Sequence, residues 1–228
     1  MNVLGFDTAT RATAVCVLRD DGEAFELEPP PARLAEPPGH ARELMPAVDR
    51  LMREAGLGFG DLGAIAVGIG PGAFTGLRIG IATAHGLAHS AGTPLHPVSS
   101  LAALAAGIPQ TGIPRTPVLA LIDARRGELF AAAYEDGREL IGPFVASPDE
   151  VVARMPEARL AAGDGSIRFR ETLESAGIRV APPESRMHVV RGLHICKLAA
   201  TVEPAPPESV LPCYLRAPDA KPRSRSGG

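Results

Sequence analysis

The chain has 228 residues, of which 45% are hydrophobic and 21% are charged, and its formal net charge is −3. A chain of this size can bury a core in one large domain or two small ones. The negative charge, the absence of tryptophan and the presence of only two tyrosines argue against direct, tight binding of nucleic acid. The one basic segment is the tail Lys221–Arg225. No apolar run reaches the ~18 residues of a membrane span, and three scattered cysteines are typical of a reduced, cytoplasmic protein.

Short apolar runs and one amphipathic pattern organise the first part of the sequence. Apolar residues at helical spacing predict a helix over His40–Ala55, which Pro46 should kink or divide. Strands are expected at Val3–Phe6, Ala12–Leu18, Glu23–Leu27 and Ala64–Val67.

A glycine-rich stretch follows the fourth of these strands. Residues 68–78 read Gly-Ile-Gly-Pro-Gly-Ala-Phe-Thr-Gly-Leu-Arg, and Thr75 is expected to cap a helix over about Gly76–Ser90. Such a strand-to-helix turn brings bare backbone N–H groups to a helix N-terminus, which suits an anion or a closely approaching chain segment. The simpler interpretation is a tight turn whose glycines need positive φ, and the turn alone favours it.

The second half of the sequence repeats the opening. A strand at Val118–Ile122 ends in Asp123, much as Val3–Phe6 ends in Asp7, and further strands are expected at Leu129–Tyr134 and Arg138–Ile141. In both halves the aspartate is followed by a turn, a second strand and a turn with glycine. We therefore infer an internal duplication.

Alternating helices and strands complete this second half. Ser147-Pro-Asp-Glu150 is a capping box, Arg159–Ala162 predicts a strand that leads into Gly163-Asp-Gly-Ser166, and Met187–Val202 predicts the last helix. Gly107–Pro117 is the expected boundary between the halves. The predicted fold class is mixed α/β, with subdomains at 1–108 and 109–203 and a Pro-rich, partly disordered tail at 204–228.

Two such halves, each with an aspartate closing its first strand, are similar to the duplicated actin/hexokinase/Hsp70-like (ASKHA, ribonuclease H-like) fold. Within that superfamily the sequence resembles the TsaB (YeaZ) family over nearly its whole length. The resemblance rests on Asp7-Thr-Ala-Thr10, His40 at the head of a helix, Gly70-Pro-Gly-Ala-Phe-Thr-Gly-Leu-Arg78, Val98-Ser-Ser-Leu101, Ile122-Asp-Ala-Arg125 with Gly127-Glu128, and Tyr214-Leu-Arg216.

The resemblance implies a scaffold rather than an enzyme. Members of this family dimerise with the catalytic paralogue TsaD, with the ATPase TsaE as a third component, for N6-threonylcarbamoylation of adenosine 37 in tRNAs that read ANN codons. We therefore expect a cytoplasmic protein that forms a homodimer without TsaD, contacts tRNA only through the complex and needs no membrane. No cofactor is expected, with weak nucleotide binding kept as an alternative.

The resemblance also assigns an interface to the two helices of the first half. Two methionines on the helix over His40–Ala55 suit an adaptable surface, and we expect its apolar residues to divide between the core and the partner. The expected partner-interface residues are His40, Leu44, Met45, Val48, Met52, Gly76, Gly80 and Thr83.

Several residues invite a catalytic interpretation. TsaD holds a metal with two histidines at positions that Ser100 and Leu104 occupy here, so no metal is expected at them. His85 and His89 share a helix face, as zinc ligands do, but Gly86 stands where a metallopeptidase needs glutamate, and surface or interface histidines are favoured.

Asp7 could orient a Mg²⁺-bound water in a phosphotransferase, or it could cap a hairpin with Thr8, which we favour. Asp123 and Glu128 could form an acid–base pair, although local ion pairing with Arg125 and Arg126 is the more natural outcome. A vestigial nucleotide or anion site would use Asp7, Thr8, Gly70, Gly72, Thr75, Gly163, Asp164 and Gly165. An ATP-dependent phosphotransferase or ATPase, and less so a metallopeptidase, are the alternative functions.

Overall fold

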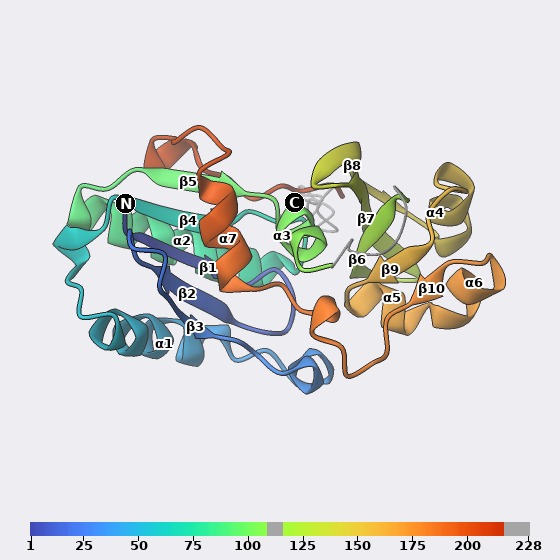
Figure 1. The fold of residues 1–228 in the computed structure, drawn as a ribbon, viewed down its shortest axis with the longest axis horizontal. Helices are drawn as coiled ribbons and strands as arrows, with labels where there is room; N and C mark the ends of the chain where they lie inside the picture. The colour runs from blue at the N-terminus through green and yellow to red at the C-terminus, as the bar shows by residue number, and fades with distance from the viewer. Residues whose placement is uncertain (109–115, 217–228) are drawn as a thin grey trace, which may run out of the picture.

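In the computed structural model, which describes residues 1–108 and 116–216, two mixed five-stranded sheets lie side by side, each with helices packed on it (Figure 1). The first sheet has the order β3-β2-β1-β4-β5 and the second the order β10-β9-β6-β7-β8. The strands of the first sheet are β1 (Val3–Asp7), β2 (Ala14–Leu18), β3 (Ala24–Leu27), β4 (Ala64–Gly68) and β5 (Leu95–Val98). Those of the second are β6 (Val118–Arg125), β7 (Glu128–Glu135), β8 (Arg138–Ala146), β9 (Leu160–Ala162) and β10 (Arg179–Val180).

The two sheets have the same topology, so the inferred duplication is confirmed. In each, the first three strands form an antiparallel meander, and the fourth and fifth strands add in parallel beside the first. Parallel addition requires a crossover, which helices supply in both halves. The crossover helices are α1 (His40–Glu54), α2 (Phe74–Ala91), α4 (Pro148–Arg154), α5 (Asp164–Arg168) and α6 (Arg170–Ser175). The fold is therefore a duplicated actin/hexokinase-like α/β fold.

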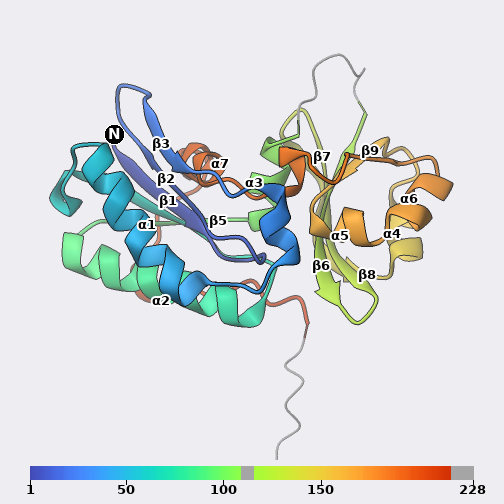
Figure 2. The same cartoon turned by 90° about the horizontal axis from the view of Figure 1, so that it is seen from below.

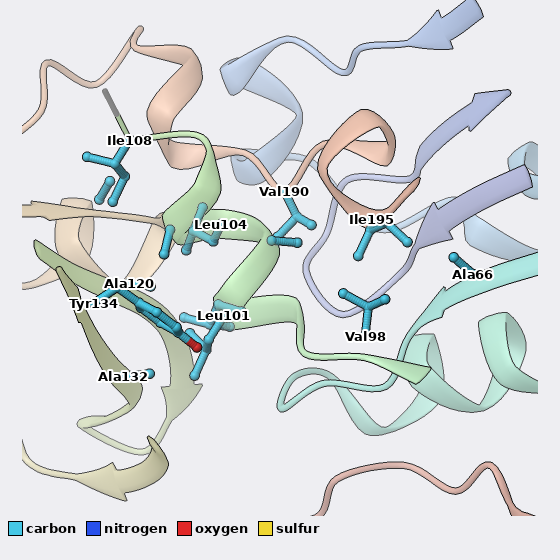
Figure 3. Close-up of a cluster of buried hydrophobic side chains, with 14 of the residues drawn as sticks. Ala66, Val98, Leu101, Leu104, Ile108, Ala120, Ala132, Tyr134, Val190 and Ile195 are labelled. Atoms are coloured by element: carbon cyan, nitrogen blue, oxygen red, sulfur yellow. The ribbon is translucent and has the colours of Figure 1, made fainter. Parts of the chain in front are cut away.

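Two further helices connect the halves. Helix α3 (Ser100–Ala106) follows the first sheet in sequence but packs on β6 and β7, and α7 (Gly192–Ala199) follows the second sheet but packs on β1 and β2. Their side chains form one hydrophobic cluster that runs between the sheets, with Leu101 beside Tyr134 and Val98 beside Ile195 (Figure 3). A cut at residue 108 or 109 would therefore separate each of these helices from the sheet that it covers.

The C-terminal segment is packed as far as residue 216. Ala205 pairs with Leu95 on the edge strand β5, Val210 is buried, and the Cys213 N–H donates to the carbonyl oxygen of Ile69 at 2.7 Å. These backbone pairs hold residues 204–216 of the tail, which we expected to be partly disordered, against the first subdomain. The basic tail Lys221–Arg225 and most of the expected boundary at 107–117 lie outside the described residues.

Three predictions about helices need correction: the start of α2, the division of α1 at Pro46 and the start of the last helix. Helix α2 begins at Phe74 with Ala73 as its N-cap, and Thr75 lies inside its first turn, because the Ala73 N–H donates to Ala9 and the Ala73 carbonyl accepts from Leu77. Helix α1 runs through Pro46 undivided, since the carbonyl freed by the proline lies on the exposed face, where water can satisfy it.

The last helix begins at Gly192 rather than at Met187. Residues 189 and 191 are extended, and the Glu26 carboxylate receives both the Arg191 guanidinium and the Leu193 N–H, so the turn starts there. No helix in the described parts of the chain is long and apolar enough to cross a membrane.

The glycine-rich loop and the first turns of α2 lie directly against the turn between β1 and β2. A Cβ atom at Gly72 would overlap Ala9, and one at Gly76 would overlap the carbonyl oxygen of Thr8. Gly80, one turn further along, faces the Thr8 hydroxyl in the same way. Gly72, Gly76 and Gly80 therefore serve the close approach of a chain segment, whereas the favoured interpretation of positive φ holds only for Gly70 (φ +99°) among the glycines of residues 68–78.

This close approach predicts opposite effects for two glycines on one helix. Both Gly76→Ala and Gly86→Ala gain about 1 kcal/mol of helix propensity, but only Gly76 is packed against another segment, whereas Gly86 faces open space. We expect Gly86→Ala to raise the free energy of unfolding and Gly76→Ala to lower it by about 1–3 kcal/mol through overpacking, as measured by urea denaturation. Equal stabilisation by both variants would contradict the packing.

Candidate docking face and inter-subdomain cleft

The expected interface residues of α1 divide between core and surface. Leu44, Val48 and Met52 are buried and pack on the first sheet, whereas Met45 is 43% exposed. The apolar stripe of this helix is thus mainly its inward face. Of the four apolar side chains, Met45 is the one that can meet a partner without rearrangement.

His40 is part of the subdomain core. Its side chain is buried, with Nδ1 2.9 Å from the Thr13 hydroxyl and Nε2 3.0 Å from the carbonyl oxygen of Thr10. The Thr13 hydroxyl also donates to Glu43 at 2.8 Å. Burial lowers the pKa of the His40 imidazole, and the neighbouring Thr10 carbonyl and Glu43 carboxylate oppose that shift in part. His40 therefore ties the start of α1 to the β1–β2 turn rather than reaching a partner.

Helix α2 turns different small residues inward and outward. Gly76 and Gly80, which we expected at the interface, are buried against Thr8, while Thr83 is half-buried near the surface. Helices α1 and α2 lie next to each other on the same side of the first sheet (Figure 2). We define the docking face as the uncharged residues on the outer surface of this layer: Met45, Pro46, Ile79, Ala82, Thr83 and Gly86.

The sequence offered a partial signal for this face. Gly and Ala recur at four-residue spacing along α2, but two such rows exist, and only packing shows which row points outward. The outer row, Ala82 and Gly86, is exposed, and the helix positions between Ile79 and Ala84 carry no charge. Small, uncharged residues at these positions permit another helix to approach closely.

A cleft of about 830 Å³ separates the two subdomains. Its first wall is formed by the starts of α1 and α2, at Gly39–Arg42 and Gly72–Gly76, and its second wall by the β6–β7 turn with Asp164. Residues 213–216 of the C-terminal segment complete the lining. This is the place where a ligand between the halves would bind.

Asp7, Thr8 and Gly70 do not line this cleft. The Asp7 carboxylate accepts hydrogen bonds from the Ser100 hydroxyl at 2.5 Å and from the Ala9 N–H at 2.8 Å, and the residue is 1% exposed. Thr8 donates its hydroxyl to the Gly76 carbonyl at 2.8 Å. Asp7 thus caps the β1–β2 turn, as favoured above, whereas Thr8 bonds to the backbone of α2 instead of capping the hairpin.

Protein atoms also fill the space beside Gly163 and Gly165, the second pair of glycines that we expected at a nucleotide site. A Cβ atom at Gly163, which has φ +105°, would overlap the Leu121 carbonyl oxygen, and one at Gly165 would overlap Leu129 and the backbone of β6. Asp164 lines the cleft, but one oxygen accepts the Asp123 N–H at 3.0 Å. Burial raises the pKa of Asp164, so its carboxyl is poorly suited to hold charge there. Of the expected nucleotide residues, Gly72, Thr75 and Asp164 line the cleft.

The carboxylates of the β6–β7 turn are held in ion pairs. Asp123 lies 2.8 Å from Arg125 and 3.0 Å from Arg168, and Glu128 pairs with Arg216. Local ion pairing is therefore confirmed for Asp123 with Arg125, and the two carboxylates do not form a free acid–base pair.

The positions that could hold a metal are filled otherwise. Ser100 donates to Asp7, and Leu104 is buried in the core beside Gly163. The His85 Nε2 atom lies 3.1 Å from the carbonyl oxygen of Val210, while His89 is exposed. Within residues 1–108 and 116–216, no three His, Cys, Asp or Glu side chains gather as a metal site would need.

The repeated sheets and the cleft between them define a protein of the actin/hexokinase type. Residues 36–193 match the family described as TsaD: tRNA N6-adenosine threonylcarbamoyltransferase. The TsaB protein of Haemophilus influenzae is 30% identical over 68% of this chain and 68% of its own length. The solved YeaZ structure from Pseudomonas aeruginosa has 30% identity and a TM-score of 0.74, covering 94% of this chain and 99% of that one. The chain belongs to the TsaB (YeaZ) family.

A mycobacterial relative is longer than this chain. An uncharacterised protein of Mycobacterium leprae is 35% identical over 96% of this chain, which spans 56% of the relative's length.

Buried Asp7 makes stability depend on pH in a predictable direction. Burial raises the pKa of its carboxyl above the ordinary value, and the hydrogen bonds from Ser100 and Ala9 only partly offset this. The folded state therefore keeps the proton to higher pH than the unfolded chain does, and stability is lost as the pH rises through that interval. Asp7→Asn keeps partners for Ser100 and Ala9 and removes this loss.

We expect the free energy of unfolding of Asp7→Asn, minus that of the wild type, to increase as the pH rises from about 4 to about 7. Urea denaturation at several pH values measures it. Asp20→Asn, at an exposed position, controls for the change in net charge. A difference that stays constant with pH would contradict a raised Asp7 pKa.

Proposed function

We propose that this chain is a non-catalytic subunit of the system that makes N6-threonylcarbamoyladenosine in tRNA, and that it activates a TsaD-type threonylcarbamoyltransferase by pairing with it. Relatives named as tRNA threonylcarbamoyladenosine biosynthesis proteins support the system. The match to the TsaD family supports a partner of the same fold.

The non-catalytic role is supported by what occupies the reactive positions. Asp7 is bonded to Ser100, Leu104 lies in the core, and the carboxylates beside the cleft are paired or buried. None of these groups is placed to supply a nucleophile or a metal ligand to a substrate in the cleft. The proposal requires no cofactor bound to this chain.

The docking face is the observation that carries the pairing. Its side chains are uncharged, and Gly86 has open space where a Cβ would stand. A partner with the same fold presents its own pair of crossover helices, so the two surfaces can meet about a two-fold or pseudo-two-fold axis. The same face would serve a homodimer when the TsaD-type partner is absent, with a TsaE-type ATPase joining the assembly in the cytoplasm and tRNAs that read ANN codons as substrates.

A bulky charge on this face should abolish pairing without unfolding the chain. Gly86→Arg and Met45→Glu both change exposed positions, whereas Gly86→Ala is the matched control that adds a methyl group only. We expect the two charged variants to weaken association with the TsaD-type protein at least tenfold by calorimetry, which corresponds to about 1.4 kcal/mol. Gly86→Ala should bind within a few-fold of the wild type.

Activity is tested by reconstitution with the TsaD-type and TsaE-type proteins of the same organism, threonylcarbamoyl-adenylate and tRNA. Modified tRNA should form with the wild type and with Gly86→Ala, and it should fall to the level without this chain for Gly86→Arg. Equal product with and without the chain would overturn the activating role. Unchanged binding of Gly86→Arg and Met45→Glu would overturn the docking face.

A further inference from the structure

The cleft between the subdomains is basic although the chain is acidic overall. Five arginines line it, against two carboxylates, Asp123 and Asp164. Asp123 is already bonded to Arg125 and Arg168, and Asp164 is half-buried and accepts the Asp123 N–H. The lining arginines are Arg11, Arg42, Arg125, Arg126 and Arg216.

Two of these arginines carry charge that no carboxylate neutralises within the described parts of the chain. Arg42, on the first turn of α1, is exposed, and its guanidinium has no hydrogen bond or ion pair there. Arg11 donates to the backbone carbonyl oxygens of Ala35 and Glu36, at 3.1 and 3.4 Å. The wall formed by the first subdomain is therefore the more positive one and can attract an anion.

An exposed aromatic pair stands at the mouth of the same cleft. The rings of Phe74 and Tyr214 stack with centroids 5.4 Å apart and are 48% and 45% exposed. Arg78 lies over the Phe74 ring at 4.0 Å and donates to the Tyr214 hydroxyl at 3.2 Å. Such a pair offers a flat surface on which a base can stack.

The starts of the two crossover helices add to this environment. Both α1 and α2 begin at the cleft, and neither has a side-chain hydrogen bond at its N-cap. The positive ends of the two helix dipoles therefore favour negative charge in the cleft.

We propose that the mouth of this cleft binds a single-stranded RNA segment, with a base on the Phe74–Tyr214 pair and flanking phosphates at Arg42 and Arg11. This inference rests on the proposed function, in which tRNA is the substrate of the assembly. It goes beyond the expectation that tRNA meets this chain only through the complex, because it gives the chain an RNA-binding surface of its own. Flat rings beside unpaired arginines match bases joined by phosphates, whereas an acidic peptide would gain nothing from the rings.

The position of the cleft fits a shared substrate. Its first wall is the N-terminal end of α1 and α2, and the docking face is the outer surface of these same helices. An RNA loop at the cleft mouth would therefore lie beside the partner, and the two chains could hold it together.

The test uses the full chain and fluorescein-labelled RNA in an anisotropy titration. One probe is a short hairpin with an anticodon-sized single-stranded loop, and the other is a blunt RNA duplex of the same length. We expect the hairpin to bind more tightly, and Tyr214→Ala to weaken hairpin binding roughly tenfold while Tyr214→Phe, which keeps the ring, restores it. Arg42→Gln should reduce the slope of log affinity against log salt concentration by about 0.7.

Arg53→Gln, at the far end of α1 and 71% exposed, is the matched control for loss of an arginine and should leave binding unchanged. Equal affinity for hairpin and duplex, or Tyr214→Ala binding as the wild type does, would overturn the inference. So would displacement of the hairpin by ATP alone or by a poly-glutamate peptide at comparable concentration. None of these outcomes depends on whether Gly86→Arg loses its association with the partner. A failure of the RNA inference can therefore be distinguished from a failure of the proposed function.

Discussion

The contact on which the rest of the structure depends is the approach of the β1–β2 turn to the glycine-rich loop and the first turns of α2. Thr8 and Ala9 lie where Cβ atoms of Gly72, Gly76 and Gly80 would stand. Because this contact holds the inner side of α2 against the first sheet, the outer side is left free with its own small, uncharged residues. It also places the start of α2 at the cleft, beside that of α1.

Enclosure by neighbouring groups gives Asp7 a structural role. Asp7 ends β1, as such an aspartate does in both halves, but its carboxylate is covered by Ser100 and the Ala9 amide. A charged group so enclosed loses its hydration and holds its proton more strongly. The Ser100 hydroxyl is the donor that keeps the aspartate inside.

Local patterns in the sequence were sufficient for the meanders, the crossover helices and the duplication, because strand and helix periodicity is set by short-range burial. They were not sufficient to predict which face of a helix is buried and which is exposed. Leu44, Val48 and Met52 have the spacing of an interface as well as that of a core, and Gly76 and Gly80 that of a helix contact on either side. The sequence also did not predict that α3 packs on the second sheet and α7 on the first, because the spacing of apolar residues in a helix does not indicate which sheet it covers.

The arginines of the cleft show most clearly what the sequence could not reveal. Arg11, Arg42 and Arg216 are separated by long stretches of chain, so neither net charge nor any window of sequence marks them as a group. Folding gathers them because His40 ties the start of α1 to the β1–β2 turn, and because the C-terminal segment crosses to pair with Glu128. A chain with a net negative charge can therefore present a positive cleft, since the field at a site is set by the groups nearest to it. The helix ends that carry this charge belong to the helices that carry the docking face, so assembly with a partner and contact with an anionic substrate would act on one rigid element.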